Sequence, residues 1–568
     1  MNQTDPLHRR PRLAWILAAL VVFSALPPET AAAQRATAVA ELFDLQGFID
    51  AQLATGQREI VIPPGRYRVA PQERQHLHLR GLRDITLMAD GVEMICTETT
   101  RAITIDACRN VTLRGLTIDY ETLPFTQAHI TGISADRREL EVTVIPGYPA
   151  PQATDSKVEI FDPTTSQLRG RFTYYETQIK PRGPRSATII KAQAGGGNAG
   201  EQIGDIAVFS IQHAPGGSMP HAIFASDSSD LVFDGITLFA SPTFGFLEVN
   251  CDGSAYRDCR VDRRPLADDL IDREFPRMRS LNADAFHSKH ARRGPRYERC
   301  TAYFMGDDAF AINGDFHLIA AQDGPVLRVL AKRDLSLRAG ERVQLFTYDG
   351  RRLEDRTIVS IEPDAPVTRA ERQFILGQQM NENLRRRGLN DGYRIELDAT
   401  VEVPRGSVIS SASAIGNGFV IVDCHLGFNR SRGILVKAGQ GLIARNTIIG
   451  VRMTGILVAP EFWWLEAGFA DDLTITGNRL SEGFGMGIAI FALGGDRSLA
   501  ELGAFRRVTV TDNRVSGGPA PSILFTSIDG LTAADNLAEP DPAISYVPRE
   551  LGAWATNRIA PIMRLNTR

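Results

Sequence analysis

An Asp-Ala-Phe triplet occurs twice in the middle of the chain, beginning at Asp284 and again 24 residues later at Asp308. An interval in the low twenties is typical of one coil of a β-solenoid, in which every coil adds a short strand to a parallel sheet. Equal positions on successive coils lie one strand spacing apart, roughly 4.8 Å. We therefore expect Asp284 and Asp308 to stack, with Asp307 adding a third carboxylate beside them.

A shorter interval repeats along the rest of the chain. Eight residues separate each of these pairs: Cys300 and Asp308, Cys424 and Arg432, Asn446 and Thr454, Asn478 and Met486, Asn513 and Pro521. The distances between pairs vary, as they do when coils share one corner and one strand but differ in their loops. The segments SRGILVKA, MTGILVAP, MGIAIFA and PSILFTS align beneath ADAFHSK and DDAFAIN. This pattern predicts an all-β protein, a right-handed parallel β-helix.

The repeat is interrupted in two places, and this predicts the organisation of the chain. Two stretches alternate apolar and polar residues between Gly and Pro turns, which indicates inserted antiparallel β subdomains. The predicted segments are a helical cap with the first coils over 34–127, an insertion over 128–212, catalytic coils over 213–317, a second insertion over 318–408, further coils over 409–540 and a tail over 541–568.

The first 33 residues have the composition of a signal peptide. Arg9, Arg10 and Arg12 precede a 14-residue apolar run, and Ala31-Ala32-Ala33 supplies an A-x-A cleavage site. The run is too short to span a membrane. We predict an exported protein, periplasmic or secreted, that is cut after Ala33 and has no membrane span after cleavage.

Charge and cysteine content exclude several classes of protein. The net charge of −4 and the pI near 6.3 provide no basic field for nucleic acid. Cys300 and Cys424 fall in the corner column that asparagines fill in later coils, so we expect them to form a buried ladder. The sequence does not decide whether disulfides join Cys96 to Cys108 or Cys251 to Cys259. No cysteine or histidine spacing is that of a zinc site.

The three aspartates are suited to hydrolysis of a glycosidic bond. This chemistry needs one carboxylic acid to protonate the leaving oxygen and one carboxylate to activate water or attack the sugar. Like charges held one strand spacing apart raise one pKa and leave another low, which separates the two roles. The other interpretations are a surface acid cluster and a calcium site.

Several motifs carry a resemblance to known families. Asn282-Ala283-Asp284 and Gly306-Asp307-Asp308 are similar to the N-x-D and D-D motifs of the pectate-lyase-like β-helix glycosidases. The segments DAFH, GDDAFAINGDFH, SRGILVKA, TGILVAP and WWLEAGFADDLTITGN resemble glycoside hydrolase family 110, exported bacterial enzymes that remove α-1,3-linked galactose with inversion. The resemblance covers most of the mature chain. It implies Asp308 as the general acid, Asp284 and Asp307 sharing the general-base role, and neither metal nor cofactor.

One departure from these families concerns the substrate. The His-containing strand motif of polygalacturonases has no clear equivalent here, since Ser431-Arg432-Gly433 stands in its place, and this argues against pectin. We expect an oligo- or polysaccharide substrate. The sugar, its linkage and any sulfate or acidic group stay open, and a homodimer built through the insertions is possible.

Further candidates for substrate binding follow from register and from the motifs. Alternate residues of a strand point to the same face, which places His287 and Lys289 beside Asn313 and Lys437. The remaining candidates are Asn282 of the N-x-D motif, Arg432, Trp464 and Glu466. The other interpretations are a structural role for His287, a salt bridge for Arg432 and simple packing for Trp463 and Trp464.

Two other functions are consistent with the sequence. A β-helix polysaccharide lyase would abstract a proton beside a uronate carboxylate, with Lys437 or Lys289 as the base. A non-catalytic, glycan-binding β-helix would need no acid and base at all. An exported inverting glycosidase of the α-galactosidase type is the leading hypothesis.

Overall fold

Three parallel sheets form the body of the protein. They are described in a computed structural model that covers residues 42–170, 173–192, 200–211, 220–544, 560–565 and 567–568. The predicted signal peptide, 1–33, lies outside the described residues. Successive coils add one strand to each sheet, so neighbouring strands are parallel and come from consecutive coils. This confirms the predicted right-handed parallel β-helix.

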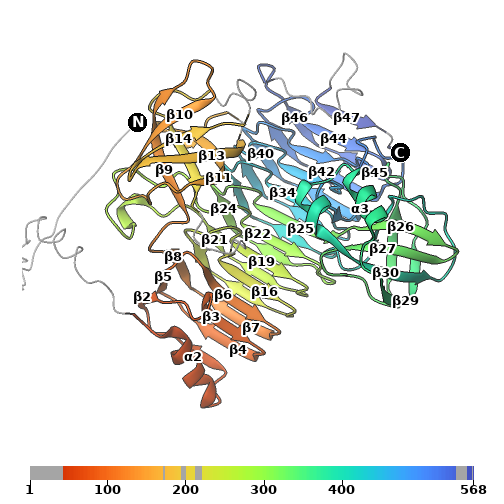
Figure 1. Cartoon of the computed structure of the whole chain (residues 1–568), viewed down its shortest axis with the longest axis horizontal. Helices are drawn as coiled ribbons and strands as arrows, with labels where there is room; N and C mark the ends of the chain where they lie inside the picture. Colours follow the sequence, from red (N-terminus) through yellow and green to blue (C-terminus); the bar gives the residue numbers. More distant parts are fainter. Residues whose placement is uncertain (1–41, 171–172, 193–199, 212–219, 545–559, 566) are drawn as a thin grey trace, which may run out of the picture. The chain divides into compact units, whose positions relative to one another are not determined.

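The strands of each sheet follow one another in chain order. The first sheet contains β1 (Glu59–Val61), β4 (Arg83–Met88), β7 (Arg109–Arg114), β17 (Val232–Asp234), β20 (Ala255–Arg257), β23 (Arg296–Glu298), β32 (Val420–Val422), β35 (Leu442–Ala444), β39 (Asp471–Thr476), β42 (Phe505–Thr511) and β45 (Ile528–Ala534). The second contains β2 (Gly65–Val69), β5 (Val92–Cys96), β8 (Thr117–Tyr120), β18 (Thr237–Leu238), β21 (Arg260–Val261), β24 (Thr301–Tyr303), β33 (His425–Gly427), β36 (Thr447–Ile449), β40 (Arg479–Ser481), β43 (Arg514–Ser516) and β46 (Leu537–Glu539). The third contains β3 (Gln75–Arg80), β6 (Arg101–Asp106), β16 (Ile223–Ser226), β19 (Phe246–Val249), β22 (Phe286–Lys289), β25 (Phe310–Asp315), β34 (Ile434–Val436), β37 (Ile456–Val458), β41 (Ile488–Ile490), β44 (Ile523–Thr526) and β47 (Ile562–Leu565). The short β38 (Glu466–Ala467) lies off this path and pairs antiparallel with the end of β25. Figure 1 shows this order as a gradual change of colour along the stack.

The register of the third sheet confirms the predicted stacking of the aspartates. Phe286 pairs with Phe310, and Phe310 pairs with Ile434. Counting back two residues on each coil places Asp284, Asp308 and Arg432 in one column. The next coil adds Thr454 to that column, because Ile434 pairs with Ile456.

A column of corner residues shows how the coils turn. Asn446, Asn478 and Asn513 are fully buried, and each donates its side-chain amide to the next asparagine at 2.9 Å. The residues just before the corner have a positive φ, for example Gly477 and Asp512, and glycine and aspartate tolerate this conformation. The ladder satisfies buried polar groups that would otherwise destabilise the turn.

Cysteines continue the same corner ladder toward the N-terminus. The backbone N–H of Cys424 donates to Asn446 at 2.9 Å, and Cys300 and Cys259 occupy the preceding corners. All six cysteines of the chain are buried and free. The buried ladder is therefore confirmed, and neither of the two disulfides left open by the sequence is formed.

Aromatic side chains stack inside the coils. The rings of Phe246, Phe286 and Phe310 lie 4.8 and 4.9 Å apart, centroid to centroid, and all three are buried. A second row, Phe233, Tyr256 and Tyr297, stacks at 4.9 and 4.7 Å. These distances equal the strand spacing, so the rows report a regular stack of coils.

A helix and a late strand lie at the two ends of the described stack. The helix α2 (Leu45–Ala54) begins at the N-cap Asp44, whose carboxylate accepts from the N–H of Gly47 at 2.9 Å. It buries Leu45 and Ile49 against the first coil. In the C-terminal tail, β47 adds a parallel strand to β44, although the sequence of the tail had no clear pattern.

Two antiparallel subdomains interrupt the stack, as the predicted fold class requires. The first is a sheet of β9 (Phe125–Ile133), β10 (Glu139–Val144), β11 (Thr154–Asp162), β12 (Gln167–Leu168), β13 (Tyr174–Gly183), β14 (Ser186–Ile190) and β15 (Ile206–Ser210). The second is a closed barrel of β26 (His317–Asp323), β27 (Val326–Lys332), β28 (Arg342–Phe346), β29 (Arg356–Asp364), β30 (Leu389–Leu397) and β31 (Val408–Ser411). The barrel segment also contains α3 (Arg369–Leu376) and the π-helix η2 (Leu384–Gly388), whereas the short η1 (Leu266–Asp268) precedes the Asp284 coil.

None of the described helices has the length and the apolar composition needed to cross a membrane.

Candidate active site

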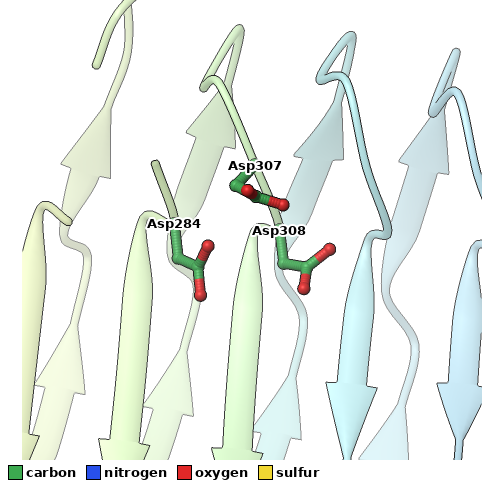
Figure 2. A group of neighbouring side chains, drawn as sticks. All are labelled: Asp284, Asp307 and Asp308. Carbon is green, nitrogen blue, oxygen red and sulfur yellow. The ribbon is translucent and has the colours of Figure 1, made fainter. Parts of the chain in front are cut away.

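The three aspartates converge at the start of two neighbouring strands of the third sheet. Asp284 precedes β22, and Asp307 and Asp308 precede β25, as Figure 2 shows. One carboxylate oxygen from each residue lies within 4.8 Å of the other two. Asp284 and Asp308 are only 5% and 3% exposed. Carboxylates held so close and so deep need cationic or hydrogen-bonding partners.

Arg432 is the partner of Asp308. Its backbone N–H donates to Asp308 Oδ1 at 2.8 Å, and its Nη1 donates to Oδ2 at 2.9 Å. The guanidinium also forms an ion pair with Glu461. The next coil therefore places a cation directly beside the carboxylate that precedes it in the column. These contacts give Arg432 the salt bridge that was the alternative, and its role in substrate binding stays a prediction.

Asp307 is held by two other cations, neither of which was among the predicted residues. Arg430 forms an ion pair with its carboxylate, and Lys157 Nζ lies 3.8 Å from it. Arg430 also donates from Nε to the carbonyl of Gly306 at 2.7 Å. Lys157 comes from β11 in the first subdomain, so the first insertion contributes directly to the cluster.

Asp284 is held by a histidine and an asparagine. His287 Nδ1 lies 2.7 Å from Asp284 Oδ2, and Asn313 Nδ2 lies 3.2 Å from His287 Nε2. Burial lowers the pKa of His287 to about 4, so the ring is neutral near pH 7. A neutral ring that accepts from Asn313 carries its proton on Nδ1 and donates to Asp284. The fully buried Asn313 thus acts through His287.

The surroundings divide the three carboxyl groups by pKa. Burial raises the pKa of Asp308 to about 6, against the opposing effect of Arg432. Burial and the charge of Asp307 raise the pKa of Asp284 well above its usual range. Burial also disfavours the charge of Asp307, but Arg430, Lys157 and Arg432 outweigh it and lower the pKa of that carboxyl. The cluster therefore retains a proton near neutral pH while Asp307 is ionised.

A cavity of about 750 Å³ opens beside the cluster, over the coils that precede it. Its walls come from β16, β19 and β22 on one side and from the second subdomain on the other. His287, Lys289, Trp464 and Glu466 line it, and Ala283 connects it to Asp284. The three aspartates themselves are not lining residues. This space is large enough for a sugar.

The loop of residues 461–466 brings Glu461 and Glu466 to the fully buried Lys437. Lys437 Nζ lies 3.0 Å from a carboxylate oxygen of each glutamate. Burial opposes a charge on either partner, yet the glutamates raise the pKa of Lys437, and Lys437, Lys332 and Lys289 keep the pKa of Glu466 well below its usual range. Lys437 is therefore a charged structural partner of Glu466, which lines the cavity.

Asn282 forms its hydrogen bonds within the protein. Its side-chain N–H groups donate to the carbonyls of Pro124 and Pro242 at 2.9 and 3.1 Å, and its Oδ1 accepts from Arg279 at 2.8 Å. Arg279 is fully buried and pairs with Glu159 of β11 at 2.9 Å. These hydrogen bonds anchor the Asp284 coil to the first subdomain, and the role of Asn282 in substrate binding stays a prediction.

The same oxygens have the spacing of a metal site, but cations of the chain already occupy them. Three carboxylate oxygens within 4.8 Å of one another could bridge a divalent ion. Arg430, Lys157 and Arg432 compete with a metal ion for Asp307 and Asp308. The donor set therefore fits acid–base chemistry better than metal binding.

Sequence reasoning missed Arg430, Glu461 and Lys157. The register could have predicted Arg430, because it occupies the same column as Gly306 on the next coil and therefore lies next to Asp307. Glu461 lies in the same loop as Trp464 and Glu466. Nothing in the sequence could have predicted Lys157, since it belongs to an insertion whose strands do not follow the repeat of the coils.

Fold and site together define a parallel β-helix protein with a buried aspartate cluster at the edge of a sugar-sized cavity. The chain matches none of the protein-family models. Among curated proteins it is similar to α-1,3-galactosidase B of Bacteroides thetaiotaomicron, with 23% identity over 496 residues, 81% of this chain and 74% of that protein. This similarity makes the chain a distant homologue of an α-1,3-galactosidase, and it confirms the resemblance that the motifs indicated.

The solved structures that are similar to the chain include a bacterial epimerase module and a bacterial adhesin. The A-module of mannuronan C-5 epimerase AlgE4 of Azotobacter vinelandii has a TM-score of 0.36 and 10% identity, covering 89% of this chain and 94% of that one. The surface adhesin PfbA of Streptococcus pneumoniae has a TM-score of 0.33 and 8% identity, covering 90% and 92%. The assignment of the fold rests on the strand register of this chain.

Proposed function

We propose that this protein is an exported glycoside hydrolase that removes terminal α-linked galactose from glycans with inversion of configuration. The observation that carries this proposal is the division of the aspartate cluster: Asp307 is paired with Arg430 and Lys157, whereas the buried Asp308 beside it has a raised pKa. Similarity to an α-1,3-galactosidase supports galactose as the sugar and the α-1,3 bond as the linkage.

Asp308 is suited to be the general acid. A pKa near 6 keeps a fraction of the carboxyl protonated in neutral solution and makes the proton easy to transfer. The two hydrogen bonds from Arg432 fix the direction of the carboxyl group. They also stabilise the carboxylate that remains after the proton has passed to the leaving oxygen.

Asp307 is suited to be the general base, with Asp284 beside it. Arg430 and Lys157 keep Asp307 ionised, so it can accept a proton from the attacking water molecule. Asp284 has a raised pKa and a hydrogen bond from His287. It therefore orients the attacking water, and the proton taken from that water is shared between Asp307 and Asp284.

The stereochemical outcome does not follow from the carboxylate spacing. The closest oxygens lie within 4.8 Å, whereas the two carboxyl groups of most inverting enzymes are about 6.5–9.5 Å apart. Inversion is supported by the resemblance to the α-1,3-galactosidases. A retaining reaction is the outcome that a stereochemical assay would distinguish.

The contacts disfavour the lyase. A lyase base must lose its proton, but Lys437 is buried between two glutamates that raise its pKa. Lys289 lies 3.3 Å from Asp315, which is also paired with Lys332 at 2.7 Å. The glutamates therefore hold Lys437 in the charged form, and Lys289 is engaged in an ion pair with Asp315.

Release of free galactose tests the proposal. The mature chain, without residues 1–33, is incubated with α-1,3-galactobiose, α-1,4-galactobiose and a β-linked galactobiose, and galactose is measured by chromatography. We expect release from the α-1,3 substrate, and a loss of about 10²–10⁴-fold in Asp308→Asn. An ultraviolet-absorbing unsaturated product from a uronate polymer, with no galactose released, would refute it.

A further inference from the structure

A second cavity, of about 360 Å³, lies on the other side of the aspartates. The coils that follow Asp308 form its floor, and Arg432, Met453, Thr454, Glu461, Trp463 and Arg497 are among its lining residues. Trp463 is 48% exposed and Met453 is 41% exposed, so both offer apolar surface to a ligand.

The column of the third sheet shows how the two cavities are arranged. Phe244, Asp284, Asp308, Arg432 and Thr454 occupy equal positions on five successive coils. Phe244 lines the first cavity, and Arg432 and Thr454 line the second. The two stacked aspartates therefore lie between the cavities, with Asp284 on the side of the first and Asp308 on the side of the second.

The loop of residues 461–466 separates the two cavities. Trp464 and Glu466 line the first, while Trp463 and Glu461 line the second. Backbone hydrogen bonds of 3.0 Å in both directions between Glu461 and Glu466 close the loop. The carbonyl of Trp463 accepts from the N–H of Asn381 in the second subdomain at 2.8 Å. The loop is thus fixed before any ligand arrives.

From this arrangement we infer that the second cavity binds the sugar on the leaving-group side of the cleaved bond, with its ring stacked on Trp463. The inference rests on the proposed function. A general acid must reach the leaving oxygen, so the leaving group lies on the side of Asp308, and Arg432 links Asp308 to this cavity. The cleaved galactose then occupies the first cavity, next to Asp284 and His287.

The chemistry of the walls defines the ligand as a neutral pyranose. The half-exposed indole and the thioether of Met453 suit the apolar face of a sugar ring. The charged groups nearest Asp308 are already paired, because Glu461 forms ion pairs with Arg432 and Lys437. The exposed Arg497 also lines this cavity and supplies donors for ring hydroxyls.

The two neighbouring tryptophans provide a matched test. Trp463→Ala and Trp464→Ala are compared on α-1,3-galactobiose, whose leaving group is a sugar, and on α-galactosyl fluoride, whose leaving group is one atom. We expect Trp463→Ala to lower kcat/KM for the disaccharide about tenfold more than for the fluoride, the size of one stacking contact. Trp464→Ala should lower kcat/KM for both substrates by a similar factor, because Trp464 lines the cavity that holds the galactose.

Equal losses on the two substrates in Trp463→Ala, or no loss on either, would overturn the inference. If the wild type hydrolyses neither substrate, the proposed function fails instead, so the two failures are distinguishable. Thermal unfolding of each variant checks that it folds. If Trp463→Ala does not fold, Met453→Ala is measured on the same pair of substrates, with the same difference expected and the same equal losses as refutation.

Discussion

Lys157 is predicted to set the acidic limb of the pH profile. It reaches the cluster from the first subdomain, and its Nζ lies 3.8 Å from the Asp307 carboxylate. At this distance, with an effective dielectric constant of about 20, the attraction between unit charges is roughly 4 kcal/mol. Burial of Lys157 offsets part of this, and Arg430 remains beside Asp307 when Lys157 is removed. The net effect of Lys157→Met should be about 1.4 kcal/mol on ionisation of Asp307.

The sign of the effect follows from the role of Asp307. A general base acts when ionised, so activity is lost as the pH falls through its pKa. Removing a neighbouring cation raises the pKa of Asp307, and the acidic limb of kcat/KM against pH should move upward by about one pH unit. The assay is galactose release from α-1,3-galactobiose between pH 3 and 9. Lys180→Met, which removes an exposed lysine of β13, is the matched control and should leave the limb in place.

A different result would refute this reasoning. Lys157 also donates to the carbonyls of Asn282 and Gly306, so its loss could act through structure alone. In that case activity would fall by the same factor at every pH and the limb would not move. Thermal unfolding of both variants separates this outcome from misfolding.

Three further predictions concern the acid, its leaving group and the core. Because burial raises the pKa of Asp308 to about 6 and the acid must be protonated, kcat/KM of the wild type should fall about tenfold per pH unit above pH 6, and a profile flat to pH 8 would contradict the assignment. Asp308→Asn should lose about 10²–10⁴-fold on α-1,3-galactobiose but far less on α-galactosyl fluoride, which needs no protonation, whereas equal losses would place Asp308 outside the acid role. Phe286→Ala removes a buried ring from the stack and should lower the free energy of unfolding by about 3–5 kcal/mol in denaturant titrations, while Val359→Ala, at a side chain that is 55% exposed, should change it by no more than about 0.5 kcal/mol.

The fold could be predicted because equivalent residues recur at fixed intervals on successive coils. The 24-residue interval between Asp284 and Asp308 and the eight-residue interval from corner to strand are both fixed by the stacking of coils, and the strand register reproduces them. The same intervals placed Cys300 and Cys424 in the asparagine ladder. The strand β47 was not predicted, because no later coil follows it with which its sequence could be aligned.

The candidate site could be predicted only where it follows the same repeat. His287, Asn313 and Arg432 lie on coils, so their register brought them to the aspartates. Which atoms meet was not predictable, and Asn313 contacts His287 where a sugar contact was expected. Lys157 and Glu159 come from an inserted subdomain whose position depends on tertiary packing, as does the division of Trp463 and Trp464 between two cavities.

The anomer of galactose that is released first decides whether the aspartate cluster activates water or attacks the sugar. The purified mature protein is mixed with α-1,3-galactobiose in an NMR tube, and the anomeric protons are followed before mutarotation. We expect β-galactose as the first product, and its loss in Asp308→Asn. Immediate α-galactose would show retention, so that one of the clustered carboxylates attacks the sugar directly, and it would contradict a mechanism in which Asp307 and Asp284 activate water.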